Sequence, residues 1–128
     1  GSLKLKEISY IHSEAYAAGE LKHGTISLIE PGIPVITVAT QANILAKTIS
    51  NMEEVKARGG VIIAVCRKGT VFAEGTVDMK LEIDADLDDM LVPLPTVCAL
   101  QLIAYYTSVL RGIDPDKPRN LAKSVTTE

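Results

Sequence analysis

Residues 34–65, PVITVATQANILAKTISNMEEVKARGGVIIAV, decide the fold. Residues 34–40 are rich in β-branched side chains, as expected for a strand that is buried on both faces. In residues 41–58 the apolar side chains recur at steps of three and four, which predicts an amphipathic helix. Gly59 and Gly60 stop that helix, and residues 61–65 form the next strand. Strand, helix and strand make a βαβ unit, so we expect parallel strands joined by a right-handed crossover.

Outward from this unit, residues 3–21 carry an apolar stripe that predicts one long helix. No capping residue precedes it, so we expect that the chain begins inside a helix and is truncated. Residues 67–78 contain two glycines and predict a loop, and residues 79–83 predict a third short strand. Residues 96–111 predict a helix that is apolar nearly all round, as is typical of a helix buried on more than one side, often at a subunit interface.

Composition excludes several classes of function. At 128 residues the chain is at most one domain, and its net charge of -3 favours neither nucleic acid nor a membrane as a partner. The longest apolar helix is shorter than the ~20 residues that span a bilayer. Cys66 and Cys98 lack metal-ligand spacing and are expected to be buried thiols of a cytoplasmic protein. The acidic residues at 84–89 fail the EF-hand pattern and predict a solvated loop, so we expect no metal site.

Three segments carry a resemblance to a known family: KLKEISY at residues 4–10, GELKHG at residues 19–24 and PRNLAKSVTTE at residues 118–128. Together they resemble the isomerase domain of the glutamine–fructose-6-phosphate aminotransferases, also called glucosamine-6-phosphate synthases. That domain is similar to two sugar-isomerase (SIS) folds in tandem. The resemblance implies a flavodoxin-like, three-layer α/β/α fold with a parallel sheet. Residues 1–112 would be part of the second SIS lobe and residues 113–128 an active-site tail. A strand before the first helix would be missing, which would leave an unpaired sheet edge.

The resemblance also implies four catalytic residues. Lys123 would form a Schiff base with the keto sugar, Glu7 would move a proton between its first two carbons, and Lys4 would assist. His23 would open the sugar ring of the neighbouring subunit, which implies a homodimer. Without the resemblance, Lys4 and Glu7 predict an exposed ion pair on one helix face, His23 a surface residue and Lys123 a solvated tail lysine. Thr25 stands where the family commonly has proline. Arg119 would fix the tail or face a polar substrate.

The implied activity is synthesis of glucosamine 6-phosphate from fructose 6-phosphate and glutamine, for amino-sugar production, with no metal and no organic cofactor. The chain lacks the first lobe and an ammonia source, so we expect it to be inactive alone. Two alternatives remain open. One is a related sugar-phosphate isomerase or a deglycase, against which the tail argues. The other is a sugar-phosphate-sensing binding module, which would need neither Glu7 nor Lys123 for its function.

Overall fold

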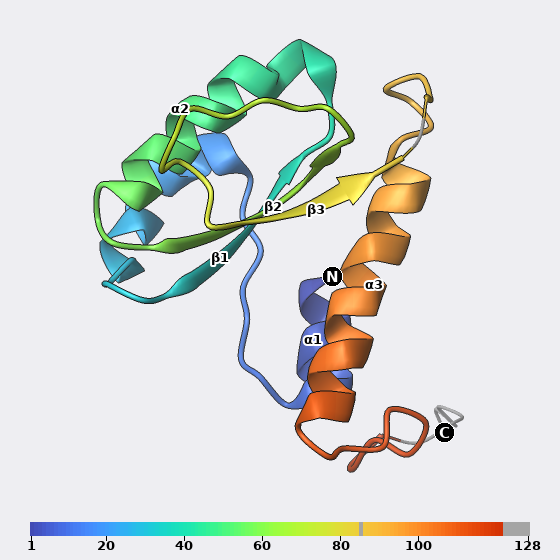
Figure 1. Cartoon of the computed structure of the whole chain (residues 1–128). Coiled ribbons are helices and arrows are strands. Elements are labelled where there is room, and N and C mark those ends of the chain that lie inside the picture. The colour runs from blue at the N-terminus through green and yellow to red at the C-terminus, as the bar shows by residue number, and fades with distance from the viewer. Residues whose placement is uncertain (85, 122–128) are drawn as a thin grey trace, which may run out of the picture. The chain divides into compact units, whose positions relative to one another are not determined.

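The computed structural model describes residues 1–84 and 86–121, which fall into two compact units (Figure 1). The sheet unit is residues 16–99. The terminal unit combines residues 1–15 with residues from 100 onward. Each unit is described below by itself.

The sheet unit is built on three parallel strands, β1 (Pro34–Ala39), β2 (Val61–Arg67) and β3 (Met79–Ile83). Their order is β1-β2-β3, with Pro34 opposite Val61 and Ile63 opposite Met79. The three strands and their parallel arrangement confirm the prediction from sequence. Within the described residues β1 and β3 are the two edges of the sheet.

Helix α2 (Leu45–Lys56) connects β1 to β2 and covers one face of the sheet (Figure 1). A 3-10 helix, η3 (Ala42–Ile44), precedes it, so the predicted helix is confirmed but its ends are trimmed. The core on this face consists of Met52, Val55, Ile62 and Ala64. Val65 points to the opposite face, because neighbouring strand residues alternate, and it is also fully buried.

The turn from α2 into β2 depends on two glycines. Gly59 has a φ of 84°, and a Cβ there would lie 2.9 Å from the Cα of Pro31. A Cβ on Gly60 would lie 2.6 Å from Cγ1 of Val55. The backbone N–H of Gly32 donates to the carbonyl of Gly59 at 2.9 Å. The glycines thus allow the chain to approach its neighbours closely and pass directly into β2.

Asp78, just before β3, joins three elements. Its carboxylate accepts from Lys56 Nζ at 2.6 Å and from the backbone N–H of Ile62 at 2.7 Å. The hydrogen bond from Lys56, with that from Ile62, lowers the pKa of Asp78. A lowered pKa means that this contribution to stability is present at neutral pH and is lost as the pH falls through the folded-state pKa.

Helix α1 (Ser2–Ser9) is shorter than the sequence predicted. It ends at Tyr10, which has the left-handed φ of 58°. The Ser9 hydroxyl donates to the Leu5 carbonyl, and the Ser2 hydroxyl donates to the Ser13 carbonyl at 3.0 Å. The second bond brings Ser13 back to the start of α1. The prediction of one continuous helix over residues 3–21 is therefore wrong, because serine side chains and the Tyr10 turn compete with helical hydrogen bonds: residues 10–17 are not helical, and residues 18–21 belong to a separate 3-10 helix.

Helix α3 (Pro93–Leu110) begins in the sheet unit and ends in the terminal unit. By length and composition it is the one helix of the described chain that could cross a membrane, which is weak evidence because core helices of soluble proteins pass the same test. Many of its apolar side chains are exposed, so the expected burial on more than one side is wrong for this chain by itself. They are Leu94, Val97, Leu102, Tyr105, Tyr106, Val109 and Leu110.

The two cysteines differ in their surroundings. Cys66 on β2 is fully buried, and this burial raises the pKa of its thiol. Cys98 on α3 is exposed. The expectation of two buried thiols is therefore confirmed for Cys66 and wrong for Cys98, which lies on the solvent side of the apolar helix.

Candidate functional site

Glu7 and Lys4 lie one helical turn apart on α1, in the terminal unit. The Nζ of Lys4 is 2.8 Å from Oε2 of Glu7. This is the same-face ion pair that the three-residue spacing predicts. The Glu7 side chain is 24% exposed and that of Lys4 52%, so the carboxylate is sheltered while still open to a small molecule. A sheltered carboxylate of this kind can exchange a proton with a bound ligand.

A cavity of about 390 Å³ lies beside Glu7. One side is formed by the end of α1 and the residues after it, and the other by the chain that follows α3. Its lining is Lys6, Glu7, Tyr10, Ile11, His12, Arg119, Asn120 and Leu121. All of these residues belong to the terminal unit. The structure therefore brings the predicted site helix and the described part of the predicted tail together around one cavity.

The tail contacts α1 through Arg119 and Tyr10. The backbone N–H of Arg119 donates to the Tyr10 hydroxyl at 2.7 Å, and the Arg119 guanidinium lies 4.2 Å from the centre of the Tyr10 ring. Arg119 thus holds the described part of the tail against α1, which is one of the two roles expected for it, and it also lines the cavity. Tyr10 was not a predicted site residue, although it closes the quoted segment KLKEISY. Lys123 lies outside the described residues, two positions after Leu121.

A single hydroxyl joins the start of this tail to the end of α1. The oxygen of the Ser108 hydroxyl, in a fully buried residue, lies 2.8 Å from the carbonyl oxygen of Ile8 and 3.0 Å from that of Ile113, and its single proton is shared between these two acceptors. Ile8 is next to Glu7 in α1, and Ile113 begins the tail. The N-terminal and C-terminal segments of the terminal unit are therefore connected at two places. Tyr10 contacts Arg119 beside the cavity, and Ser108 near the end of α3 contacts Ile8 of α1.

His23 belongs to the sheet unit, where it ends the 3-10 helix η1 (Ala18–His23). Its side chain is 73% exposed, and its Nδ1 lies 3.0 Å from a carboxylate oxygen of Glu20. A carboxylate only accepts hydrogen bonds, so this contact places the proton on Nδ1 and leaves Nε2 of the neutral ring as an acceptor. Because the side chain is largely exposed, Nε2 is available to exchange a proton with a bound molecule.

The segment that carries His23 is tied to α2. Lys22 Nζ lies 3.1 Å from Oε1 of Glu54, and Arg58 Nη1 lies 3.2 Å from Oε2 of the same residue. These contacts lower the pKa of Glu54, the hydrogen bond from Lys22 first and that from Arg58 second. The second 3-10 helix, η2 (Thr25–Leu28), follows directly. Its first residue, Thr25, donates to the Leu21 carbonyl at 3.5 Å and so closes the His23 loop.

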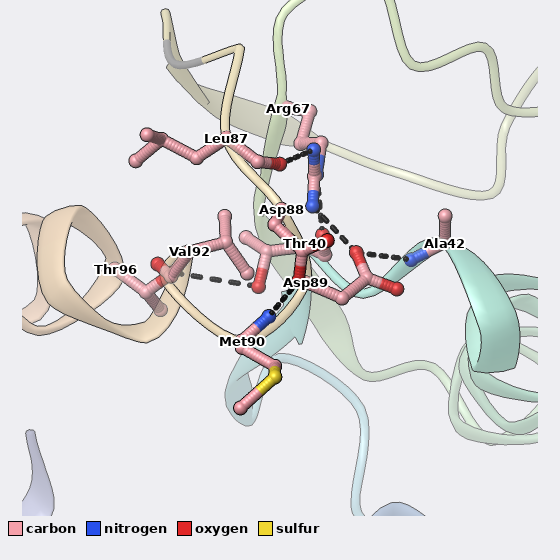
Figure 2. Close-up of polar contacts among 9 residues, drawn as sticks. All are labelled: Thr40, Ala42, Arg67, Leu87, Asp88, Asp89, Met90, Val92 and Thr96. Carbon is pink, nitrogen blue, oxygen red and sulfur yellow. Dashed lines mark hydrogen bonds and ion pairs between the residues drawn. The ribbon is translucent and has the colours of Figure 1, made fainter.

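A second polar cluster lies at the carboxyl end of the sheet, where ligands commonly bind in parallel α/β folds. Figure 2 shows Arg67 at its centre. The guanidinium donates to the Thr40 carbonyl at 2.7 Å, to the Leu87 carbonyl at 2.6 Å and to the Asp89 carboxylate at 2.5 Å. Asp89 also accepts from the backbone N–H of Ala42 at 3.3 Å. The cluster thus joins the ends of β1 and β2 to the loop before α3.

This cluster corrects the expectation of a wholly solvated acidic loop. Asp89 is paired with Arg67, and Asp84 lies 2.8 Å from Lys68. Asp88 accepts from the backbone N–H of Met90 at 2.9 Å and so shapes the approach to α3. Sequence reasoning missed Arg67, because its partners lie 20 or more positions away. No group of three or more His, Cys, Asp or Glu among residues 1–84 and 86–121 could hold a metal.

Replacing Arg67 by methionine should lower the free energy of unfolding by about 2 kcal/mol, because two carbonyls and one carboxylate lose their donor in a partly buried site. Urea-induced unfolding would measure this change. Lys68→Met is the matched control. Its pair with Asp84 is exposed, with side-chain exposures of 65% and 80%, so the expected change is within about 0.5 kcal/mol. Equal effects of the two substitutions would show that the Arg67 cluster does not stabilise the fold.

Comparison with known proteins agrees with this architecture. The family model described as "SIS domain" matches residues 1–111. The chain is 58% identical over 128 residues to the glutamine–fructose-6-phosphate aminotransferase of Caldanaerobacter subterraneus subsp. tengcongensis, and 54% identical to that of Clostridium acetobutylicum. These matches cover the whole of this chain and 21% of each relative. The chain thus spans about a fifth of the length of the curated relatives it matches.

Solved structures give the same result. The C-terminal domain of glucosamine-fructose-6-phosphate aminotransferase from Francisella tularensis aligns with a TM-score of 0.80 and 41% identity, over 91% of this chain and 32% of that one. Glucosamine-6-phosphate deaminase from Thermotoga maritima aligns with a TM-score of 0.69 and 28% identity, over 97% of this chain and 34% of that one. The parallel sheet flanked by helices is the sugar-isomerase fold that was expected. The chain belongs to the SIS domain family.

Proposed function

We propose that this chain is the C-terminal part of the isomerase region of an enzyme that makes glucosamine 6-phosphate from fructose 6-phosphate and glutamine. The observation that carries the proposal is the cavity that Glu7 shares with Arg119, Asn120 and Leu121. It places a sheltered carboxylate next to the segment that leads to Lys123. The relatives match the whole of this chain, and the proposed reaction is taken from their names.

In this proposal residues 1–112 form part of an SIS lobe and residues 113–128 form the active-site tail. His23 takes a proton from the cyclic sugar through Nε2 and returns one to the ring oxygen, which opens the ring. The Lys123 amine attacks the C2 carbonyl, and loss of water gives an imine. Ammonia derived from glutamine then replaces the lysine nitrogen on C2, which releases Lys123 and leaves an imine of the sugar. Glu7 removes a proton from C1 and delivers it to C2, which leaves an amine on C2 and an aldehyde at C1, while Lys4 supports the neighbouring hydroxyl. No metal or organic cofactor is needed for these steps.

The proposed enzyme is a homodimer in the cytoplasm, and its partners are sugar phosphates. The exposed apolar side chains of α3 support a protein interface, because a soluble chain rarely leaves so many of them open to water. The chain alone would be inactive, since most of the length of its relatives is absent from it. The missing part would supply a second lobe and the ammonia.

Calorimetric titration with fructose 6-phosphate would test the proposal on two samples, the 128-residue chain and a longer protein that contains the whole isomerase region. We expect saturable binding and turnover only in the longer protein. Saturable binding by the 128-residue chain would show that it carries a complete pocket, and a sugar-phosphate-sensing module would then be the better description. Turnover of fructose 6-phosphate that transfers no nitrogen even when an ammonium salt is added would instead favour a related isomerase.

A further inference from the structure

Tyr10 occupies a backbone conformation that few non-glycine residues adopt. Its φ of 58° and ψ of 24° are left-handed, and its N–H donates to the Lys6 carbonyl at 3.2 Å, which closes the last turn of α1. Glycine is the residue usually found in this position, because a Cβ makes the conformation less favourable. A tyrosine in such a position needs compensating contacts, and the side chain of Tyr10 makes two of them.

Both contacts are to Arg119, although the two residues are 109 positions apart in the sequence. The Tyr10 hydroxyl accepts the Arg119 backbone N–H at 2.7 Å, which fixes the path of the main chain. The Tyr10 ring lies beneath the Arg119 guanidinium, 4.2 Å from its central carbon. The ring contact is an attractive cation–π arrangement. The main chain and the side chain of Arg119 are thus held by one residue.

The tail is also held at its beginning, where the Ser108 hydroxyl binds the Ile113 carbonyl. Between these two points Asp114 shapes a turn by accepting the backbone N–H of Asp116 at 2.9 Å. The segment from 113 to 119 therefore has two fixed ends and an internal turn. Tyr10 determines where Arg119 lies, and Arg119 is the last fixed point before residues 120–121, which line the cavity with Glu7.

We propose that Tyr10 is a positioning residue that sets how the C-terminal tail leaves Arg119 toward the cavity lined by Glu7. Lys123 follows Arg119 by four positions in the sequence, so under the proposed function a changed path at Arg119 is expected to slow the reaction of the Lys123 amine. Tyr10 itself touches no reacting atom in this mechanism. The inference rests on the proposed function for its catalytic consequence, but the clamp between Tyr10 and Arg119 can be tested without any reaction.

Two substitutions separate the two contacts. Tyr10→Phe keeps the ring and removes the hydroxyl, and Tyr10→Ala removes both. In the longer protein, the rate of imine formation at Lys123, trapped with borohydride at saturating fructose 6-phosphate, should fall about threefold to tenfold for Tyr10→Phe. It should fall roughly tenfold to a hundredfold for Tyr10→Ala. Ser50→Ala, which removes the hydroxyl of an exposed residue on α2 in the sheet unit, should leave the rate unchanged.

Hydrogen exchange on the 128-residue chain gives a readout that depends on no reaction. Tyr10→Phe should raise the exchange rate of peptides covering residues 113–121 and leave those covering β1 and β2 unchanged. Faster exchange in every peptide would show a general loss of stability, and the positioning role would then be rejected. Unchanged exchange at residues 113–121 would reject the clamp itself.

The failure of this inference differs from failure of the proposed function. If the unsubstituted longer protein forms no borohydride-trapped product, the proposed function fails, while exchange still decides whether Tyr10 holds the tail. If that protein reacts and Tyr10→Phe changes neither exchange nor rate, only the inference is wrong. Faster local exchange with an unchanged rate would show a contact that does not position the amine, which also overturns it.

Discussion

Glu7→Gln should lower turnover of fructose 6-phosphate in the longer protein by about 10²- to 10⁴-fold, because the proposed role of Glu7 is to move a proton from C1 to C2 and an amide cannot do so. The substitution preserves size and leaves an acceptor for Lys4, which lies 2.8 Å from the Glu7 carboxylate. Imine formation precedes the proton transfer, so borohydride should still trap the sugar on Lys123. The measurements are kcat and the wash-in of deuterium at the migrating position.

The matched control is Glu30→Gln, which neutralises an exposed carboxylate in the sheet unit. Its kcat should stay within a factor of about two, since it lines no part of the cavity beside Glu7. If the kcat of Glu7→Gln also stayed within a factor of about two of the unsubstituted protein, another group would carry out the proton transfer. If Glu7→Gln lost both the trapped imine and its turnover, Glu7 would act in or before imine formation, which is earlier than proposed.

Lys123→Arg should abolish the trapped product and lower turnover on the order of 10³-fold or more, because the proposed function makes Lys123 the covalent nucleophile and loss of such a group is among the largest catalytic losses known. Arginine keeps the positive charge and much of the length, but its guanidinium stays protonated and cannot attack a carbonyl. Mass spectrometry after reduction would show whether the sugar remains attached, since borohydride converts the imine to a stable amine.

Lys117→Arg, in the same tail and exposed, is the control for this substitution and should leave the trapped product unchanged. A trapped product that persists in Lys123→Arg would place the imine on a different lysine. Lys6 would then be the next residue to test, because it lines the cavity beside Glu7.

The sequence predicts the sheet unit well, because its elements are defined by local patterns. The strand expected over residues 79–83 matches β3 in both of its ends, and the glycine pair at 59–60 marks the turn into β2. Helix α1 was overestimated for a local reason too. Its apolar spacing continues past Ser9, whereas the chain turns at Tyr10. The chain then runs back toward the start of α1, where the Ser2 hydroxyl binds the Ser13 carbonyl.

The candidate site was predictable only in part. Lys4 and Glu7 are close in sequence, so helical spacing alone gave their pairing. Tyr10 with Arg119, and Arg67 with Asp89, are joined across distant parts of the chain, and no periodicity reports such contacts. The exposure of α3 was missed for a related reason, since apolar composition shows that a face is apolar without showing what covers it.

The division into two units has a consequence for the order of folding. The sheet unit is continuous in sequence, so it can fold as soon as residue 99 has been synthesised. The terminal unit cannot form until residues 100 onward are available to pack with residues 1–15. Bringing these two segments together closes a long loop and costs chain entropy. The cavity beside Glu7 is therefore expected to form last, and a ribosome-stalled or prematurely terminated chain would carry a folded sheet without that cavity.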